Sequence, residues 1–278
     1  MTSFILKNNN ISFNDIYKIV NENLNISLDS SVIERINKSR TYLEDKIIRS
    51  NESFYGINTG FGDLHNIKIK DDDLAKLQVN LIKSHACGSG DKIDSELVKL
   101  MLLLKIISLS KGFSGIKLKT VERLIFFFNK NINPIVYKYG SLGASGDLAP
   151  LSHLSLPLIG LGEVEYKDKI YKSEEILTKF KLEPLALGSK EGLALINGTQ
   201  FMLASLINST INSINLSKVI LANPNFQLIV TVMLSDKEKT VTEYHELVSS
   251  YFSLKNKLYD LFSNFNQLTG LSLEFNKN

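Results

Sequence analysis

The chain has 278 residues, of which 44% are hydrophobic, and this is enough apolar material for one or two domains with a sizeable core. Its formal net charge of +3 is too small to indicate a nucleic-acid partner, and no dense stripe of lysine and arginine alternates with aromatic residues. The single cysteine, Cys87, excludes an internal disulfide, and the lack of a signal pattern or of an eighteen-residue apolar run predicts a soluble, cytoplasmic protein.

Two helices are predicted before residue 50. Ser12 is suited to cap a helix that runs to Asn21. Residues 31–50 predict a second helix, because apolar side chains such as Val32 and Ile36 recur there at spacings of three and four.

Residues 54–62 interrupt this helical pattern. The nonapeptide Phe-Tyr-Gly-Ile-Asn-Thr-Gly-Phe-Gly holds three glycines and three aromatic residues, and it therefore predicts a loop. Its glycines are typical of an ordinary turn. The alternative is functional: Tyr55 is a phenol on a glycine-rich loop, a position suited to acid–base chemistry or to orienting a substrate.

Helical periodicity returns from Asp72 to His85, and Gly88 is the candidate C-cap. By its position near a helix end, His85 is typical of a capping or otherwise satisfied structural histidine. Residues 94–96 then predict the start of an apolar helix over 97–109, and a further helix covers 118–129. Because these two helices are apolar nearly all round, we expect them in the core rather than lining a groove.

The segment Gly140–His153 is the most informative in the chain. Between an extended run (residues 135–139) and an apolar run that Pro150 opens, it holds three glycines, two serines and two alanines. A tight glycine-rich turn into a buried helix would explain this composition. The spacing matches neither of the common glycine-rich phosphate-binding patterns.

Ala144-Ser145-Gly146 permits a second interpretation, in which the backbone closes into a ring. A backbone nitrogen that attacks a carbonyl two residues back needs a chain without side-chain clashes, and Gly146 and Ala144 meet this need. The hydroxyl of Ser145 can leave as water and give a methylidene group. The product would be an electrophilic alkene that no ordinary side chain supplies.

The chain after this loop predicts a buried segment over 151–161, a surface hairpin over 163–171 and a helix over 173–180. Lys190–Gln200 follows, and its Asn197-Gly198 pair is an ordinary turn signal. The side chain of Asn197 also offers a donor and an acceptor, which suits a carboxylate or a ring carbonyl.

Four of these segments resemble motifs of the aromatic amino acid ammonia-lyases, the family of the histidine and phenylalanine ammonia-lyases. They are Tyr-Gly-Ile-Asn-Thr-Gly-Phe-Gly from Tyr55, Asn-Leu-Ile-Lys-Ser-His-Ala-Cys-Gly from Asn80, Gly140–His153, and Lys-Glu-Gly-Leu-Ala-Leu-Ile-Asn-Gly-Thr-Gln from Lys190. They occur in the family's order, and the resemblance covers residues 12–220. It implies a mainly α fold, in which an N-terminal helical domain with glycine-rich active-site loops leads into the start of a long central helix bundle.

The resemblance implies that Ala144, Ser145 and Gly146 form the prosthetic group 4-methylidene-imidazol-5-one (MIO) autocatalytically. The electrophile would turn the substrate amine into a better leaving group, and Tyr55 would take the β-proton as the general base. No metal is implied.

The resemblance also implies that His85 and Asn197 bind the substrate. The Ser84-His85 pair favours the histidine lyases, because the phenylalanine lyases tend to carry apolar residues there. The implied reaction is the non-oxidative deamination of L-histidine to trans-urocanate and ammonia, the first step of histidine degradation, in a homotetramer of the family type.

Other interpretations stay open. A phenylalanine or tyrosine ammonia-lyase, or an aminomutase, is the alternative within the enzyme class. The resemblance covers only the first half of the family chain, and the second half supplies an arginine for the substrate carboxylate, whereas Arg123 is the one arginine here beyond residue 49. We therefore divide the chain into a lyase-like region (1–222) and a divergent segment of uncertain fold (223–278). The alternative from another functional class is a truncated helical relic of the family without catalytic activity.

Overall fold

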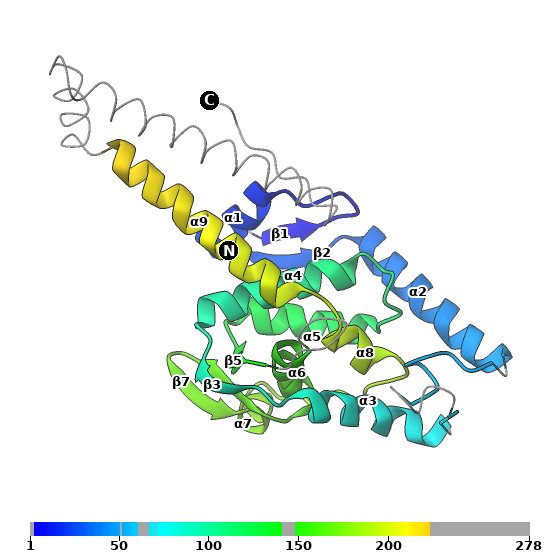
Figure 1. Ribbon diagram of the computed structural model, residues 1–278. Helices are drawn as coiled ribbons and strands as arrows, with labels where there is room; N and C mark the ends of the chain where they lie inside the picture. Colours follow the sequence, from blue (N-terminus) through cyan, green and yellow to red (C-terminus); the bar gives the residue numbers. More distant parts are fainter. Residues whose placement is uncertain (1–2, 51, 61–66, 70, 141–147, 223–278) are drawn as a thin grey trace, which may run out of the picture. The chain divides into compact units, whose positions relative to one another are not determined.

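The computed structural model describes residues 3–50, 52–60, 67–69, 71–140 and 148–222 (Figure 1). Its contacts divide the chain into two units, one formed by Met1–Asn8 with Leu24–Leu206 and the other by Asn9–Asn23 with Ile207–Asn278. The segment predicted to be divergent, 223–278, lies outside the described residues, so its boundary and fold stay predictions.

Helices dominate the described residues, as the sequence predicts. None of these helices is both long enough and apolar enough to cross a membrane. They are α1 (Phe13–Asn21), α2 (Ser30–Arg49), α3 (Asp71–His85), α4 (Ser95–Ser110), α5 (Leu118–Asn129), α6 (Ala149–Ser155), the 3-10 helix η2 (Leu156–Ile159), α7 (Ser173–Lys179), α8 (Glu191–Ile196) and α9 (Gln200–Ala222).

Short strands form three small sheets in the described part of the chain. In the first, β1 pairs with β2 in parallel, and in the second, β3 pairs with β5 in antiparallel. The third is antiparallel in the order β4-β6-β7, and the predicted hairpin supplies β6 and β7. The bounds are β1 (Ser3–Leu6), β2 (Asn25–Leu28), β3 (Ser89–Lys92), β4 (Asn133–Pro134), β5 (Tyr137–Tyr139), β6 (Glu163–Tyr166) and β7 (Lys169–Lys172).

The first residues of α1 and α4 show which capping predictions from the sequence are confirmed. Ser12 caps α1 as predicted, and with Asp15 it forms a complete capping box. Asp94 occupies the N-cap position of α4, but its side chain makes no cap hydrogen bond, and the helix begins two residues before the predicted start, at Ser95.

The two apolar helices form the core, as predicted. α4 packs against α5, and from Val98 to Ser110 nearly every side chain of α4 is buried. The extended run predicted over 135–139 is shorter in the structure, since only Tyr137–Tyr139 forms a strand. The apolar run after it folds into α6 and η2, which ends at Gly160 in the left-handed conformation.

Candidate active site

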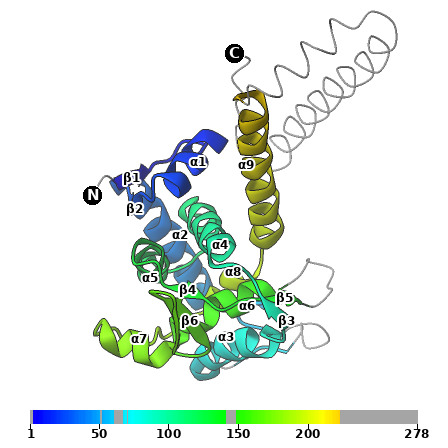
Figure 2. The same cartoon turned by 90° about the vertical axis from the view of Figure 1, so that its left-hand side faces the viewer.

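Three helices of the first unit pack against one another and carry, or border, the predicted site residues. They are α3, α6 and α8, and both views show them side by side (Figures 1 and 2). The side-chain oxygen of buried Gln78 on α3 accepts the backbone N–H of Leu193 on α8 at 3.2 Å. At Gly192 a Cβ would lie 2.5 Å from the carbonyl oxygen of Gln78, so the close approach of α3 and α8 requires glycine there.

His85 is the last residue of α3, and its side chain is half-buried. Its Nδ1 lies 2.9 Å from the carbonyl oxygen of Leu81 and 3.1 Å from the hydroxyl of Ser84. A carbonyl oxygen only accepts, so Nδ1 carries the hydrogen and Nε2 is left as the acceptor of the neutral ring. The helix thus fixes the tautomer of His85, as the structural interpretation expects. The same contact leaves Nε2 as a ring nitrogen that is suited to a ligand.

The chain just after His85 is fastened to α6. The backbone N–H of Gly88 donates to Nε2 of His153 at 2.9 Å, and a Cβ at Gly88 would lie 3.0 Å from that nitrogen. Tyr137 meets the His153 ring edge to face, with the ring centroids 5.1 Å apart. The prediction of Gly88 as the C-cap of α3 is wrong: it lies three residues beyond the helix, without the left-handed φ of a C-cap glycine, because its N–H reaches a distant histidine instead.

The same contacts hold both flanks of the predicted ring-forming tripeptide. Ala144, Ser145 and Gly146 lie outside the described residues. On one flank, Tyr139 of β5 pairs with Ser89 of β3, directly after the His85 segment. On the other flank, Leu148 leads into α6, which packs on both α3 and α8. The described ends of the segment are therefore held beside His85 and α8.

Tyr55 lies on a separate loop, residues 54–60, which we call the tyrosine loop. Its side chain is 58% exposed, whereas Asn58 and Thr59 are buried beneath it. The amide of Asn58 accepts the N–H of Phe54 at 2.6 Å and donates to the carbonyl of Glu52 at 2.9 Å. A polar interior therefore shapes the loop, and Tyr55 is presented on its outer side.

The tyrosine loop is also joined to a segment that borders α3. The N–H of Ile69 donates to the carbonyl of Asn58 at 2.9 Å, and Thr59 forms an antiparallel bridge with Lys68. A groove of about 410 Å³ is lined by Lys68 and Ile69 and, from α3, by Asp73, Lys76, Leu77 and Asn80. The loop is thus linked through Lys68 and Ile69 to a groove along the part of α3 that precedes its His85 end.

A buried carboxylate anchors the start of α8. Glu191 has no exposed surface, and it accepts the N–H of Gly188 at 2.7 Å, the N–H of Lys117 at 3.1 Å and the hydroxyl of Thr120 at 2.6 Å. The ammonium of Lys117 lies 3.5 Å away. Lys190, just before the helix, has a φ of 68°, a conformation that L side chains rarely adopt. Glu191 therefore fixes α8 to α5 and to the loop that precedes it.

Asn197 ends α8 as its C-cap residue, and its side chain is exposed. Its backbone carbonyl accepts a hydrogen bond from Nζ of Lys105 on α4 at 2.9 Å. Burial lowers the pKa of the Lys105 ammonium to about 7. After Asn197, Gly198 has a φ of 144°, and the buried side chain of Gln200 lies against it.

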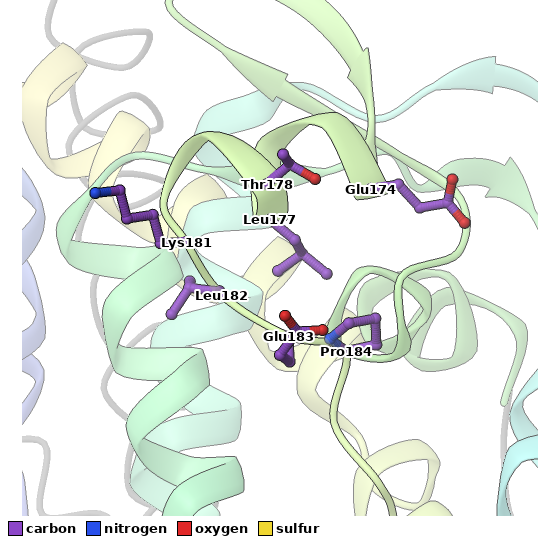
Figure 3. Close-up of a pocket in the computed structure, with 7 residues that line it drawn as sticks. All are labelled: Glu174, Leu177, Thr178, Lys181, Leu182, Glu183 and Pro184. Carbon is purple, nitrogen blue, oxygen red and sulfur yellow. The ribbon is translucent and has the colours of Figure 1, made fainter.

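Another cavity lies between α7 and the chain that follows this helix. It measures about 460 Å³ and is lined by α7 and the chain that follows, with Leu177 and Leu182 among its walls and Glu174 and Lys181 at opposite sides (Figure 3). It contains none of the predicted site residues. Among the described residues, no group of three or more histidine, cysteine, aspartate or glutamate side chains is arranged to hold a metal ion.

The model of one protein family, described as aromatic amino acid lyase, matches residues 11–248. The chain belongs to the aromatic amino acid lyase family. Its lyase relatives include the histidine ammonia-lyase of Streptococcus pyogenes, with 41% identity over 214 residues. Among solved structures, histidine ammonia-lyase from Trypanosoma cruzi has a TM-score of 0.69 at 34% identity, and phenylalanine aminomutase from Pantoea agglomerans has a TM-score of 0.69 at 31% identity.

These matches cover most of this chain but less than half of each lyase relative. The streptococcal match includes 77% of this chain and 42% of the relative. The two structures match over 78% and 74% of this chain, and over 41% and 39% of their own chains. The chain therefore spans about two fifths of the length of the curated relatives it matches.

Motif reasoning missed three residues whose hydrogen bonds shape the candidate site: His153, Glu191 and Lys105. The first two stand inside the motifs, but nothing in their spacing shows that they accept hydrogen bonds from distant backbone. A signal for Lys105 was present, since a lysine stands inside a helix that is otherwise apolar nearly all round.

Proposed function

We propose that this chain carries out histidine ammonia-lyase chemistry, in which L-histidine loses ammonia and a β-proton to give trans-urocanate. One observation carries the proposal: the described flanks of Ala144-Ser145-Gly146 are fastened to the chain around His85, through the Gly88–His153 hydrogen bond and the β3–β5 pair. Support comes from the histidine ammonia-lyases among the relatives.

The residues around the tripeptide fit the formation of MIO from Ala144, Ser145 and Gly146. The segment leaves β5, which pairs with β3 just after α3, and returns at α6, which packs on α3 and α8, so its ends are positioned before the ring closes. On α3, which packs on α6 and α8, the buried Nε2 of Gln78 has no hydrogen-bond partner among the described residues. Once formed, the group supplies an electrophile that makes the amine a better leaving group.

The chain's own side chains supply the remaining chemistry. We propose Tyr55, which is exposed on the tyrosine loop, as the base that takes the β-proton of the substrate. His85 offers Nε2 as an acceptor, because the carbonyl of Leu81 occupies Nδ1. The exposed amide of Asn197 offers a donor and an acceptor at the end of α8. His85 and Asn197 would bind and orient the substrate.

His85 favours histidine as the substrate over phenylalanine. An acceptor nitrogen at the end of α3 complements the N–H of an imidazole, whereas a phenyl ring offers no such partner. Deamination or isomerisation of another aromatic amino acid remains the alternative, since an aminomutase structure matches the fold equally well. We further propose assembly of the chain as a homo-oligomer, a tetramer of the family type.

Two measurements on the purified chain test this proposal. Ring closure and loss of the Ser145 hydroxyl each release one water, so the intact mass falls by about two waters. Incubation with L-histidine is expected to give the rising ultraviolet absorbance of urocanate, at a higher rate than product forms from L-phenylalanine or L-tyrosine. A cyclised mass without product from any of the three amino acids would instead favour an inactive relic.

A further inference from the structure

Lys105 is a buried cation in the most apolar helix of the protein. It is 1% exposed, and its neighbours on α4, Leu104 and Ile106, are buried with it. Burial of an ammonium group is unfavourable unless the charge has a partner. Here that cost is visible in the lowered pKa of Lys105, for which burial is the cause.

The partner that the structure provides is a backbone carbonyl rather than a carboxylate. Nζ donates to the carbonyl oxygen of Asn197 at 2.9 Å, across 92 residues of sequence. Among the ion pairs of the described residues, none includes Lys105. The buried charge is therefore directed at one point of the backbone, the residue that ends α8.

That point is electrostatically suited to a cation. The last carbonyl groups of a helix lack partners within the helix and carry partial negative charge. Asn197 is the C-cap residue of α8, and the six residues of α8 give the turn little support of their own. The next residue, Gly198, has a φ of 144°. Because glycine can adopt many backbone conformations, the turn depends on contacts from outside it to keep this one.

We propose that Lys105 is a positioning residue for Asn197: by holding its backbone carbonyl from the core, it fixes the turn and sets the direction in which the Asn197 amide is presented. The catalytic part of this proposal rests on the proposed function, in which that amide binds the substrate. The positioning part concerns the backbone alone and can be measured without activity.

The test compares Lys105→Met with Lys99→Met in the full chain. Both variants remove a lysine from α4, but Lys99 is only half-buried and lies over the ring of Phe128. Hydrogen exchange, followed by mass spectrometry, is measured on one peptide that covers 193–203 and on one that covers 97–110. We expect Lys105→Met to exchange about tenfold faster at 197–200, with unchanged exchange in α4, and Lys99→Met to match the parent at 197–200.

Kinetics separate positioning from a general loss of structure. Misplacement of a binding group by about an ångström can lower a rate by about 100-fold. For Lys105→Met we expect kcat to fall by about 10- to 100-fold with a smaller change in KM, and for Lys99→Met we expect parental values. Equal exchange at 197–200 in Lys105→Met and parent, or equal loosening of α4 and the turn, would overturn the proposal.

Two further outcomes keep the proposals apart. If the parent shows the uncyclised mass or makes no product, the proposed function fails, while the exchange measurement still decides whether Lys105 holds the turn. If Lys105→Met does not fold, Lys105→Gln replaces it, since its amide keeps a shorter donor. Faster exchange at 197–200 in Lys105→Gln than in the parent supports the proposal, and unchanged exchange overturns it.

Discussion

The turn after α8 and the tyrosine loop present their site residues by different means. α8 is held at its start by the buried carboxylate of Glu191 and at its end by the buried ammonium of Lys105. The tyrosine loop is held by the neutral side chains of Asn58 and Thr59, with Tyr55 exposed above them. Because buried charged side chains hold the turn after α8, its conformation depends on the stability of the whole fold. The conformation of the tyrosine loop depends instead on local hydrogen bonds.

The largest effect is expected at Glu191. Glu191→Ala leaves three donors without their acceptor and Lys117 without its charge partner, so we expect a loss of about 3–5 kcal/mol in the free energy of unfolding. Denaturant unfolding measures it. The control, Glu191→Gln, keeps the shape and one accepting oxygen, and is expected to lose less. A loss below about 1 kcal/mol in Glu191→Ala would show that the buried carboxylate does not make α8 depend on the core more than the tyrosine loop does.

A smaller loss is expected where α3 and α8 approach each other. In Gly192→Ala the new Cβ would lie 2.5 Å from the backbone carbonyl oxygen of Gln78, so the helices must separate, at a cost of about 2–3 kcal/mol. Thermal unfolding measures the change. Ala194→Ser, on the half-buried side of the same helix, is the control and should remain within about 0.5 kcal/mol of the parent.

The interior of the tyrosine loop should be less important for stability. Asn58→Ala removes two hydrogen bonds from a buried amide, and we expect a loss of about 1–2 kcal/mol together with a clear fall in kcat. Asn58→Asp keeps the acceptor for Phe54 but not the donor to Glu52, and should fall between Asn58→Ala and the parent. Activity that survives intact in Asn58→Ala would show that the loop needs no internal support.

A pH dependence is expected from the contact between Gly88 and His153. Burial lowers the pKa of His153 below its usual 6.5, so the folded state resists a proton that the unfolded state accepts. Stability from this residue is therefore present above about pH 6.5 and declines as the pH falls below it. We expect a lower melting temperature at about pH 5 than at about pH 7.5, and a smaller difference in His153→Gln, whose amide oxygen can still accept. An equal pH dependence in His153→Gln would contradict the assignment.

The smallest effect on stability is expected at Tyr55. Because its side chain is more than half exposed, Tyr55→Phe should change the free energy of unfolding by less than about 0.5 kcal/mol. Loss of the proposed base should nevertheless lower kcat by about 10²- to 10⁴-fold. The formation of urocanate measures the rate, and the intact mass serves as the control, since the ring should form without Tyr55. Full activity in Tyr55→Phe would remove it from the site.

The sequence predicts this architecture well wherever short-range patterns decide it. α5 begins and ends at the predicted residues, and Ser12 caps α1, because periodicity and capping act within a few residues. The hairpin over β6 and β7 is also confirmed, with Lys167 and Asp168 at its tip in the left-handed conformation.

The contacts that shape the site were not predictable in this way. Gly88 reaches His153 across 65 residues and Lys105 reaches Asn197 across 92, so neither pair leaves a local signal. The prediction of Gly88 as a cap fails for this reason. The assignment of Tyr55, Ala144, Ser145, Gly146, His85 and Asn197 to the site rests on motifs and stays a prediction.

The intact mass of the purified chain, compared with that of Ser145→Ala, tests the central claim most directly. We expect the parent to be lighter than its sequence mass by about two waters, whereas Ser145→Ala, which has no hydroxyl to lose, does not show this deficit. A parent at its full sequence mass would rule out formation of the electrophile, and with it the proposed lyase chemistry.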